Sequence, residues 1–218
     1  MKFLIYFLLT FVVYSCNPIE YRKPVFYYEY FPVELDVTKE YFVLNIFYSS
    51  FGTDTNSYFL KETVSEIMLD NQGDTVFRIN RFTKSDTLED YVIKDIWTVK
   101  KTNRSIEVVE ENERFIKMVF PLNEYLYWNG NAFNGREPQE YYIEKIHENH
   151  NLNDNIFDST VTVIQNFTTN QIEYESAKEV YANETGLIYK ENIVLNINNG
   201  NLSDVNYGSI YIQELVNH

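Results

Sequence analysis

Short runs rich in apolar, aromatic and β-branched residues recur along the chain, and polar turns separate them. Such runs are typical of β-strands. The strands predicted in this way cover residues 41–50, 74–82, 91–100, 104–109, 114–120, 157–166, 187–197 and 209–216. Because strands and helices do not alternate, the pattern predicts an antiparallel sheet and disfavours a parallel α/β sheet.

Turn sequences between these runs indicate hairpins. Residues 70–73 (DNQG) precede one predicted strand, and residues 110–113 (EENE) separate two others. Asn199-Gly200 suits a type I′ turn, in which both central residues take positive φ. We expect the glutamates of residues 110–113 to form a solvated turn.

Two segments leave the choice between helix and strand open. Residues 58–70 place apolar side chains at helical spacing, yet the alternation of a strand fits about as well. Residues 139–147 also allow a short helix. The predicted fold is therefore mainly β: a single antiparallel domain, either a sandwich or a curved sheet, with at most one or two short helices.

The chain begins with an apolar segment that is too short to cross a bilayer. Lys2 is followed by an apolar run at residues 3–14. As a helix this run would span about 18 Å, against a hydrocarbon core of roughly 30 Å. The length instead fits the apolar region of a secretory signal peptide.

Cys16, the single cysteine of the chain, directly follows this segment and the small residue Ser15. The sequence Val13-Tyr14-Ser15-Cys16 resembles the lipobox of bacterial lipoproteins, in the loose form found in Bacteroidetes. The resemblance implies that the signal peptide is cut before Cys16 and that Cys16 carries acyl chains such as palmitate. An ordinary signal peptide with an incidental cysteine is the alternative interpretation.

The lipobox divides the chain into three parts. Residues 1–15 are the predicted signal peptide, residues 16–32 the lipidated N-terminus and tether, and residues 33–218 a single β-rich domain. The tether combines prolines with many aromatic residues. We therefore expect its second half to lie on the domain.

Further motifs resemble those of small exported Bacteroidetes lipoproteins. They are Tyr30-Phe31-Pro32 after a tyrosine-rich leader, Trp128-Asn129-Gly130-Asn131, residues 157–160 (FDST) and residues 186–191 (GLIYKE). At residues 39–42 (KEYF) the chain departs from the Gly-Asn-Tyr-Trp turn of that group. The resemblance implies a cell-envelope protein, lipid-anchored to the outer membrane on its periplasmic face or at the cell surface, and it implies no particular activity.

The chain is acidic, with a net charge of −14. Nucleic-acid binding depends on Lys and Arg side chains that neutralise phosphates, so this charge argues against a nucleic-acid partner. A single cysteine also excludes an intramolecular disulfide, so the fold depends on packing. The expected partners are the membrane, through the lipid on Cys16, and an envelope protein.

The sequence contains no recognisable catalytic or cofactor-binding motif, such as G-x-S-x-G, HExxH or a Walker loop. His147 and His150 could share a metal site on a helix, but their polar surroundings favour a surface loop. We therefore expect a protein that is not an enzyme, with no cofactor and no metal. A glycan hydrolase stays open, because it needs only two positioned carboxylates.

Three residues are candidates for modification or recognition. Thr75 and Thr87 lie in Asp-Thr-apolar triplets, the pattern at which those bacteria O-glycosylate exported proteins. Trp128 precedes the predicted turn at Asn129-Gly130 and could stack on a ligand. Packing in the core is the alternative for Trp128.

We expect an outer-membrane or surface-anchored lipoprotein that acts as a non-catalytic binding or accessory subunit of envelope machinery. One alternative is a carrier of lipid or acyl chains with an apolar cavity. The other is a glycan-binding protein or glycan hydrolase.

Replacing Cys16 with alanine tests the anchor. The variant lacks the thiol that the acyl chains require, so labelling by radioactive palmitate should fall to background. Ser15→Ala keeps a small residue before the cysteine and should be labelled like the wild type; persistent labelling of Cys16→Ala would overturn the lipoprotein prediction.

Overall fold

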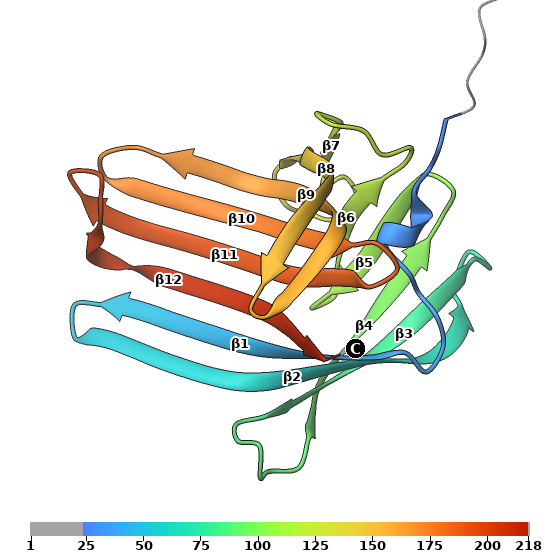
Figure 1. Cartoon of the computed structure of the whole chain (residues 1–218), viewed down its shortest axis with the longest axis horizontal. Helices are drawn as coiled ribbons and strands as arrows, with labels where there is room; N and C mark the ends of the chain where they lie inside the picture. Colours follow the sequence, from blue (N-terminus) through green and yellow to red (C-terminus); the bar gives the residue numbers. More distant parts are fainter. Residues whose placement is uncertain (1–23, 218) are drawn as a thin grey trace, which may run out of the picture.

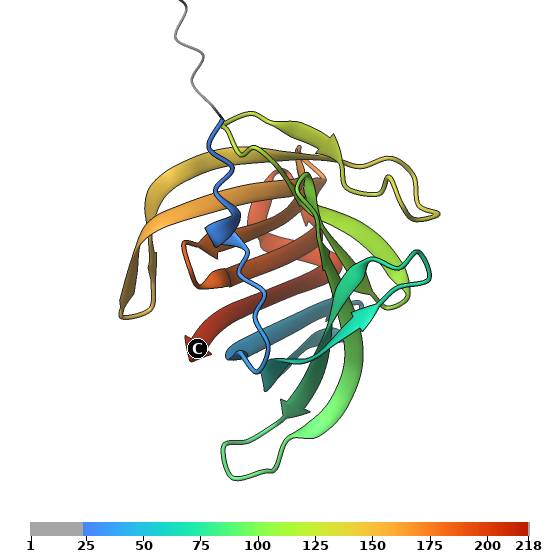
Figure 2. The same ribbon diagram turned by 90° about the vertical axis from the view of Figure 1, so that its right-hand side faces the viewer.

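The protein is described by a computed structural model that covers residues 24–217. Twelve antiparallel strands form one sheet in the order β6-β5-β4-β3-β2-β1-β12-β11-β10-β9-β8-β7. The sheet curls until its two edge strands approach each other, which gives a nearly closed, barrel-like shape (Figure 1, Figure 2). The predicted antiparallel β fold is confirmed, in the form of a curved sheet.

The strands are β1 (Thr38–Ser49), β2 (Gly52–Leu69), β3 (Thr75–Lys84), β4 (Val92–Lys101), β5 (Ser105–Glu110), β6 (Glu113–Val119), β7 (Tyr127–Asn129), β8 (Glu140–Leu152), β9 (Asn155–Thr169), β10 (Glu173–Ala182), β11 (Gly186–Asn198) and β12 (Asn201–Asn217). Tyr28–Tyr30 forms a short 3-10 turn, η2. Within residues 24–217 there is no helix with the length and apolar character that a membrane span needs.

Two meanders of six strands make up the sheet. Strands β1–β6 follow one another along the sheet, as do β7–β12, and the pairing of β1 with β12 joins the two halves. The predicted hairpins are present: β5 pairs with β6, and Asn199 and Gly200 connect β11 to β12 with φ values of 51° and 71°. These positive φ values fit the expected type I′ turn.

The barrel closes through a few bonds between β6 and the β7 region. The backbone N–H of Ile116 donates to Gly130 O at 2.9 Å. In return, the indole N–H of Trp128 donates to Ile116 O at 2.8 Å, and Asn134 Nδ2 donates to Arg114 O at 3.0 Å. The two edge strands therefore satisfy part of each other's hydrogen-bonding capacity, which protects them from pairing with other chains.

The N-terminal segment, residues 24–37, lies across one open end of the barrel (Figure 2). Tyr30 on this segment is 1% exposed, and its hydroxyl lies 2.7 Å from both His147 Nδ1 and Ser159 Oγ. Lys101 Nζ donates to two carbonyl oxygens of the segment, at 3.1 and 2.8 Å. The expectation that the second half of the tether lies on the domain is confirmed.

Both segments of uncertain type are strands. Residues 58–69 belong to β2, which pairs with β1 on one side and β3 on the other, and residues 140–147 belong to β8. Alternate residues of β2 face the interior, where Leu60 is fully buried. Pairing on both edges therefore decides the structure of a segment whose local pattern fits a helix equally well.

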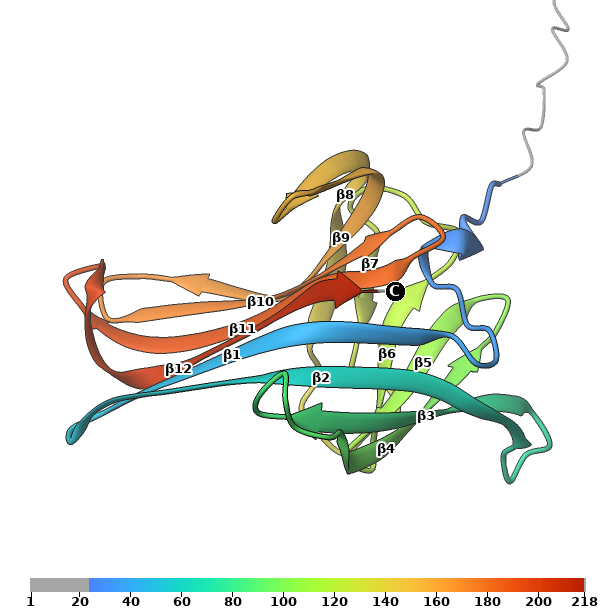
Figure 3. The ribbon, with the colours of Figure 1, turned by 60° about the horizontal axis from the view of Figure 1, so that its bottom comes forward.

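Strands β4–β7 close the barrel at one end only. Strands β1, β2, β10, β11 and β12 extend beyond this closed part (Figure 3). Their distal ends are three hairpin turns, β1–β2, β9–β10 and β11–β12. The core is concentrated at the other end, where Tyr30 packs with Val99, Met118 and Ile143. The structure thus consists of a filled barrel end and a long, open extension.

Removing the Tyr30 hydroxyl should destabilise the barrel measurably. The Tyr30→Phe variant leaves His147 and Ser159 without their shared partner, at a cost of about 1–3 kcal/mol. Urea unfolding followed by tyrosine fluorescence would measure this change. Tyr207→Phe is the matched control, because Tyr207 is 61% exposed; its effect should stay within about 0.5 kcal/mol. Equal stability of the two variants would mean that the N-terminal segment does not contribute to the fold.

Candidate functional site

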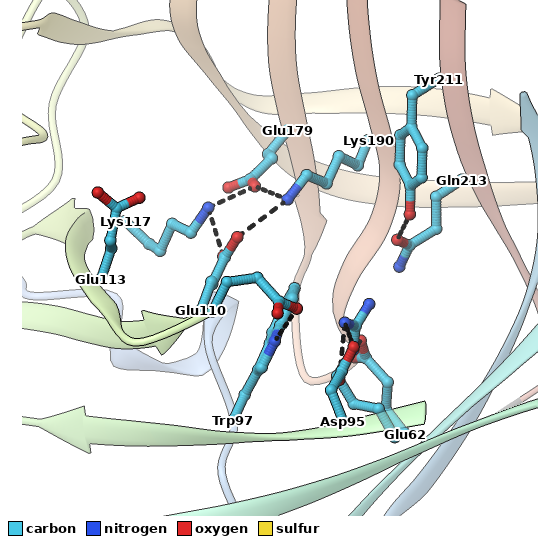
Figure 4. Close-up of polar contacts among 12 residues, drawn as sticks. Glu62, Asp95, Trp97, Glu110, Glu113, Lys117, Glu179, Lys190, Tyr211 and Gln213 are labelled. Carbon is cyan, nitrogen blue, oxygen red and sulfur yellow. Dashed lines mark hydrogen bonds and ion pairs between the residues drawn. The ribbon is translucent and has the colours of Figure 1, made fainter. Parts of the chain in front are cut away.

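The barrel interior contains four charged side chains that we call the ion cluster: Glu110, Lys117, Glu179 and Lys190 (Figure 4). Lys117 Nζ lies 2.7 Å from Glu110 Oε1 and 2.9 Å from Glu179 Oε1. Lys190 Nζ lies 3.2 Å from Glu179 Oε1 and 3.6 Å from Glu110 Oε2. Each lysine contacts both carboxylates, so the cluster is neutral overall.

The curl of the sheet brings these four residues together. Glu179 on β10 and Lys190 on β11 are direct cross-strand partners. Glu110 ends β5 and Lys117 lies on the neighbouring β6. Because β5–β6 and β10–β11 belong to different halves of the sheet, the cluster forms only when the barrel closes.

The members of the cluster keep their charges although they are shielded from water. Burial alone would raise the pKa of Glu179, but the neighbouring Lys117 and Lys190 outweigh it and hold the pKa at about 2. The pKa of Glu110 is lowered in the same way. Burial would lower the pKa of Lys117, but the two carboxylates raise it instead. Tyr181 donates its hydroxyl to Glu179 as well.

A second buried network surrounds Arg81 on β3, whose side chain is 3% exposed. Its Nε donates to Glu62 Oε1 at 2.8 Å, and its Nη1 donates to the two oxygens of Asp95 at 3.0 and 3.1 Å. The guanidinium carbon lies 3.5 Å from the centroid of the Trp97 ring. A planar guanidinium suits both contacts, so Trp97 has a structural partner inside the barrel.

On one side of the ion cluster lies an open pocket of about 320 Å³, which we call the polar pocket. Amide, charged and aromatic side chains dominate its lining. Besides Glu110, Lys117 and Lys190, they include Phe115, Arg136, Gln139, Tyr141, Gln165 and Asn192.

Three neutral polar groups of the polar pocket have no hydrogen-bond partner within residues 24–217. Gln165 is 9% exposed, and its amide nitrogen is buried without an acceptor. The Asn192 amide and the Tyr141 hydroxyl make no hydrogen bond with a described residue either. Burial raises the pKa of Tyr141 to about 12, so its hydroxyl stays protonated and can donate. The Tyr141 hydroxyl and the Asn192 amide are therefore available to a ligand, whereas the Gln165 amide nitrogen is shielded from solvent.

On the other side of the cluster lies a smaller cavity of about 90 Å³, which we call the apolar cavity. The N-terminal segment forms part of its wall through Phe31, Pro32 and Val33. The remaining wall combines aliphatic side chains such as Val64, Val99 and Leu187 with aromatic ones. It also includes Lys39, Glu62, Gln213 and the four residues of the ion cluster. The ion cluster thus separates a polar site from an apolar one.

The chemistry that this interior can perform is narrow. A general acid needs a pKa near the working pH, whereas the pKa values of Glu110 and Glu179 are both lowered. Among the described residues, no group of three or more His, Cys, Asp or Glu side chains is placed to hold a metal ion. Ionised carboxylates of this kind are poor general acids at neutral pH.

The residues singled out in the sequence do not converge on this interior. Cys16 lies outside the described residues. Thr75, at the start of β3, and Thr87, in the β3–β4 turn, are both exposed. Their O-glycosylation stays a prediction, and the structure leaves both hydroxyl-bearing side chains accessible.

Trp128 is half-buried and does not line the polar pocket. Its indole nitrogen is occupied by Ile116 O, and its ring lies edge-on to Tyr141 at 6.1 Å between centroids. Stacking of Trp128 on a ligand stays a prediction, while the contacts that the structure shows are structural.

Two interpretations of charged segments are wrong. Glu110 is not part of a solvated turn, because its side chain is 15% exposed and pairs with Lys117. His147 and His150 do not lie in a surface loop but on β8, which pairs with β9. In both cases the polar segment belongs to a hairpin of the sheet, β5–β6 for Glu110 and β8–β9 for the two histidines.

Sequence reasoning missed Lys117, Glu179, Lys190 and Gln165. Each of them lies within or beside an apolar run in which strand alternation allows either face to be the buried one. An ionisable residue among apolar neighbours is a usable signal, but the buried face follows only from the long-range pairing of strands.

Comparisons with known proteins give a limited result. No protein-family model matches the chain, and no curated protein matches it. A solved structure from Bacteroides fragilis, described as an exported protein with a YmcC-like fold, is similar with a TM-score of 0.45 and 11% identity, over 85% of this chain and 98% of that one. A structure from Parabacteroides distasonis, described as a lipoprotein, has a TM-score of 0.38 and 11% identity, over 89% of this chain and 100% of that one.

The lowered pKa of Glu179 predicts a loss of stability in acid. A carboxyl whose folded-state pKa is about 2, against an ordinary value near 4.5, stabilises the fold above about pH 4.5. This contribution, about 3 kcal/mol, is lost as the pH falls toward 2. Urea unfolding between pH 7 and 2 would measure it.

The Glu179→Gln variant should be less stable at pH 7 and should lose less stability over the same pH interval. Glu148→Gln is the control, because Glu148 and its partner Lys145 are both more than half exposed and such pairs contribute about 0–1 kcal/mol. Identical pH profiles for Glu179→Gln and the wild type would contradict the assignment.

Proposed function

We propose that this protein is a lipid-anchored protein of the cell envelope that binds a small neutral saccharide in its polar pocket without transforming it. The observation that carries this proposal is a pair of neutral polar groups on the pocket lining, the Tyr141 hydroxyl and the Asn192 amide, which make no hydrogen bond with a described residue. The hydroxyl groups of a ligand can pair with both of them.

The ligand is neutral because the charges around the pocket already compensate one another. Lys117 and Lys190 pair with Glu110 and Glu179, and Arg136 pairs with Glu113. What remains free is a set of uncharged groups: the Asn192 amide and the Tyr141 phenol hydroxyl. A charged ligand would find no unpaired counter-ion among the charged residues of the lining.

A saccharide matches this set better than other neutral molecules. Its hydroxyl groups both donate and accept hydrogen bonds, as amide side chains do, and its apolar ring face can contact an aromatic ring such as Phe115. The volume of about 320 Å³ falls at the lower end of the range of small-molecule sites, about 300–1,000 Å³. One or two sugar rings are the expected size.

Hydrolysis is not part of the proposal. Glycosidases use a protonated carboxylic acid whose pKa is raised. In this pocket, Glu110 is held ionised by its lysine partners. The same contacts that fix the carboxylate in place remove its ability to donate a proton at neutral pH.

The predicted carrier of acyl chains is less compatible with the dimensions of the interior. The apolar cavity measures about 90 Å³, whereas a cavity that holds one benzene measures about 150 Å³. A long acyl chain does not fit it in this conformation. An accessory role in envelope machinery, with the anchor at Cys16 on the outer membrane, stays part of the proposal. The protein would then bind the saccharide at the outer membrane.

A glycan array followed by isothermal titration calorimetry would test the proposal. The wild type should bind one class of neutral saccharides, and Tyr141→Phe and Asn192→Leu should each weaken binding about tenfold or more, a loss of about 1.4 kcal/mol. Tyr141→Phe removes a hydroxyl without a partner among the described residues, so it should leave the melting temperature largely unchanged.

Asn103→Leu is the control, because Asn103 is an exposed residue of the β4–β5 turn, far from the pocket lining. It should bind like the wild type. Absence of any saccharide ligand, or equal affinity of all three variants, would overturn the proposed ligand. Release of a cleaved sugar would overturn the non-catalytic assignment.

A further inference from the structure

In the open extension, polar side chains face the interior and apolar side chains face outward. Asn192 lines the polar pocket and therefore faces the interior, together with its cross-strand partner Tyr211 and with Asn45 on β1. The next residue of β11, Ile193, faces outward, because successive side chains of a strand point to opposite faces. An antiparallel sheet with one solvated face usually has its polar side chains on the outside, so the extension reverses the common arrangement.

Cross-strand pairing gathers the outward side chains into one apolar surface, which we call the outer face. Ile46 on β1 is opposite Ile210 on β12, and Ile210 is opposite Ile193 on β11. The same and neighbouring rows add further apolar residues: Leu44, Tyr48, Phe167, Tyr174, Leu195 and Ile212. Except for the buried Leu195, all of these side chains are at least partly accessible to solvent.

Near the filled end, a hairpin of the chain itself covers the outside of the sheet. The tip of β8–β9 lies over β10 and β11 (Figure 1), where Leu152 is buried in one cluster with Val180 and Ile188. The ring of His150 lies 6.1 Å from that of Tyr189. Farther along the strands, Figures 1 and 3 show no described element over the outer face. Within residues 24–217, the extension is therefore a single layer with an uncovered apolar side.

The outer face has no net charge. Its central row runs from Thr55 on β2 through the three isoleucines to Ser176 on β10 and contains no charged side chain. In the neighbouring row, Lys178 and Glu191 lie 3.3 Å apart and neutralise each other. Copies of a chain with a net charge of −14 repel one another, so two copies can approach most closely at a surface without net charge.

The outer face is also large enough for a stable interface. Strands β2, β1, β12, β11 and β10 lie about 4.8 Å apart, and about seven residues of each rise about 3.3 Å apiece, so the surface measures roughly 24 Å by 23 Å. Two such surfaces together bury about 1,100 Å², against the roughly 1,000 Å² that a specific interface requires. An aliphatic centre with hydroxyl-bearing edges also matches the apolar core and polar rim of such interfaces.

We propose that the outer face is the interface of a symmetric dimer of this chain. A two-fold axis parallel to the strands lays β12 of one copy over β12 of the other, and β1 over β11, so that the isoleucine row meets itself. At the edges, Thr53 on β2 then faces Tyr174 on β10, and neither hydroxyl makes a hydrogen bond with a described residue. The same axis keeps both N-terminal segments at one end, as anchorage in one membrane requires. The dimer does not depend on the proposed saccharide.

Sedimentation velocity and native mass spectrometry of the full chain, purified in mild detergent, test the proposal. The wild type should have twice the mass of one chain at micromolar concentration. Ile193→Glu should be monomeric, with a dissociation constant at least a hundredfold higher, because a symmetric interface would contain two unpaired charges.

Val194→Glu is the matched control, because Val194 is the next residue of the same strand, is 43% exposed and faces the interior. It should remain a dimer. Ile210→Glu is a second test of the interface if a thermal melt shows that Ile193→Glu folds poorly. Mixing Ile210→Glu with Ile210→Lys should restore the dimer, because β12 faces β12 and opposite charges then meet.

A monomeric wild type would overturn the proposal, whether the outer face then binds detergent or another envelope protein. A dimer that persists in both Ile193→Glu and Ile210→Glu would overturn it as well, because the copies would then meet elsewhere. Dissociation of Val194→Glu to the same extent as Ile193→Glu would place the interface on the inner side of the extension and equally contradict it.

Discussion

Mutual neutralisation of four charges, two of them buried and two partly buried, is the constraint on which the interior of this barrel depends. Lys117 and Glu110 come from the first half of the sheet, and Glu179 and Lys190 come from the second. Any one of them would be costly without the others, so the closed barrel is the arrangement in which all four are satisfied. Such a network contributes more to the choice of one closure than to net stability. It also divides the interior, because it forms a wall between two sites of different character.

The difference between occupied and free polar groups decides what the interior can bind. The charged side chains are bonded to each other and have little capacity left, while the Gln165 and Gln213 amide nitrogens are buried without acceptors. Each of these amides lies on a different side of the ion cluster. The hydrogen-bonding capacity that is left in the interior therefore belongs mainly to neutral groups, because the charges of the ion cluster and of the Arg81 network are already paired with one another.

Local sequence predicts most of the sheet and little of the site. The hairpin at residues 110–113 and the turn at Asn199-Gly200 follow from short-range rules, since turn chemistry and strand alternation are local properties. The strand at residues 58–69 and the burial of Glu110 do not. The first depends on pairing with both β1 and β3, and the second on the contact with Lys190 in the other half of the sheet. The pairing of β1 with β12 determines which face of each strand points inward, and no local pattern contains this information. Trp128 illustrates the same limit, since its partner Ile116 becomes a neighbour only when the barrel closes.

The pairing of Glu40 with Asn217 places both ends of the described chain at the same end of the barrel (Figure 1). In a molecule that is tethered through its N-terminus, the long strands therefore extend away from the point of attachment. The turns at residues 50–51, 170–172 and 199–200 then form its far tip, where Phe51 and Ile172 are exposed to solvent. These three hairpin turns are the part of the molecule farthest from the tether. A label attached to the C-terminus would lie at the opposite end, beside the tether.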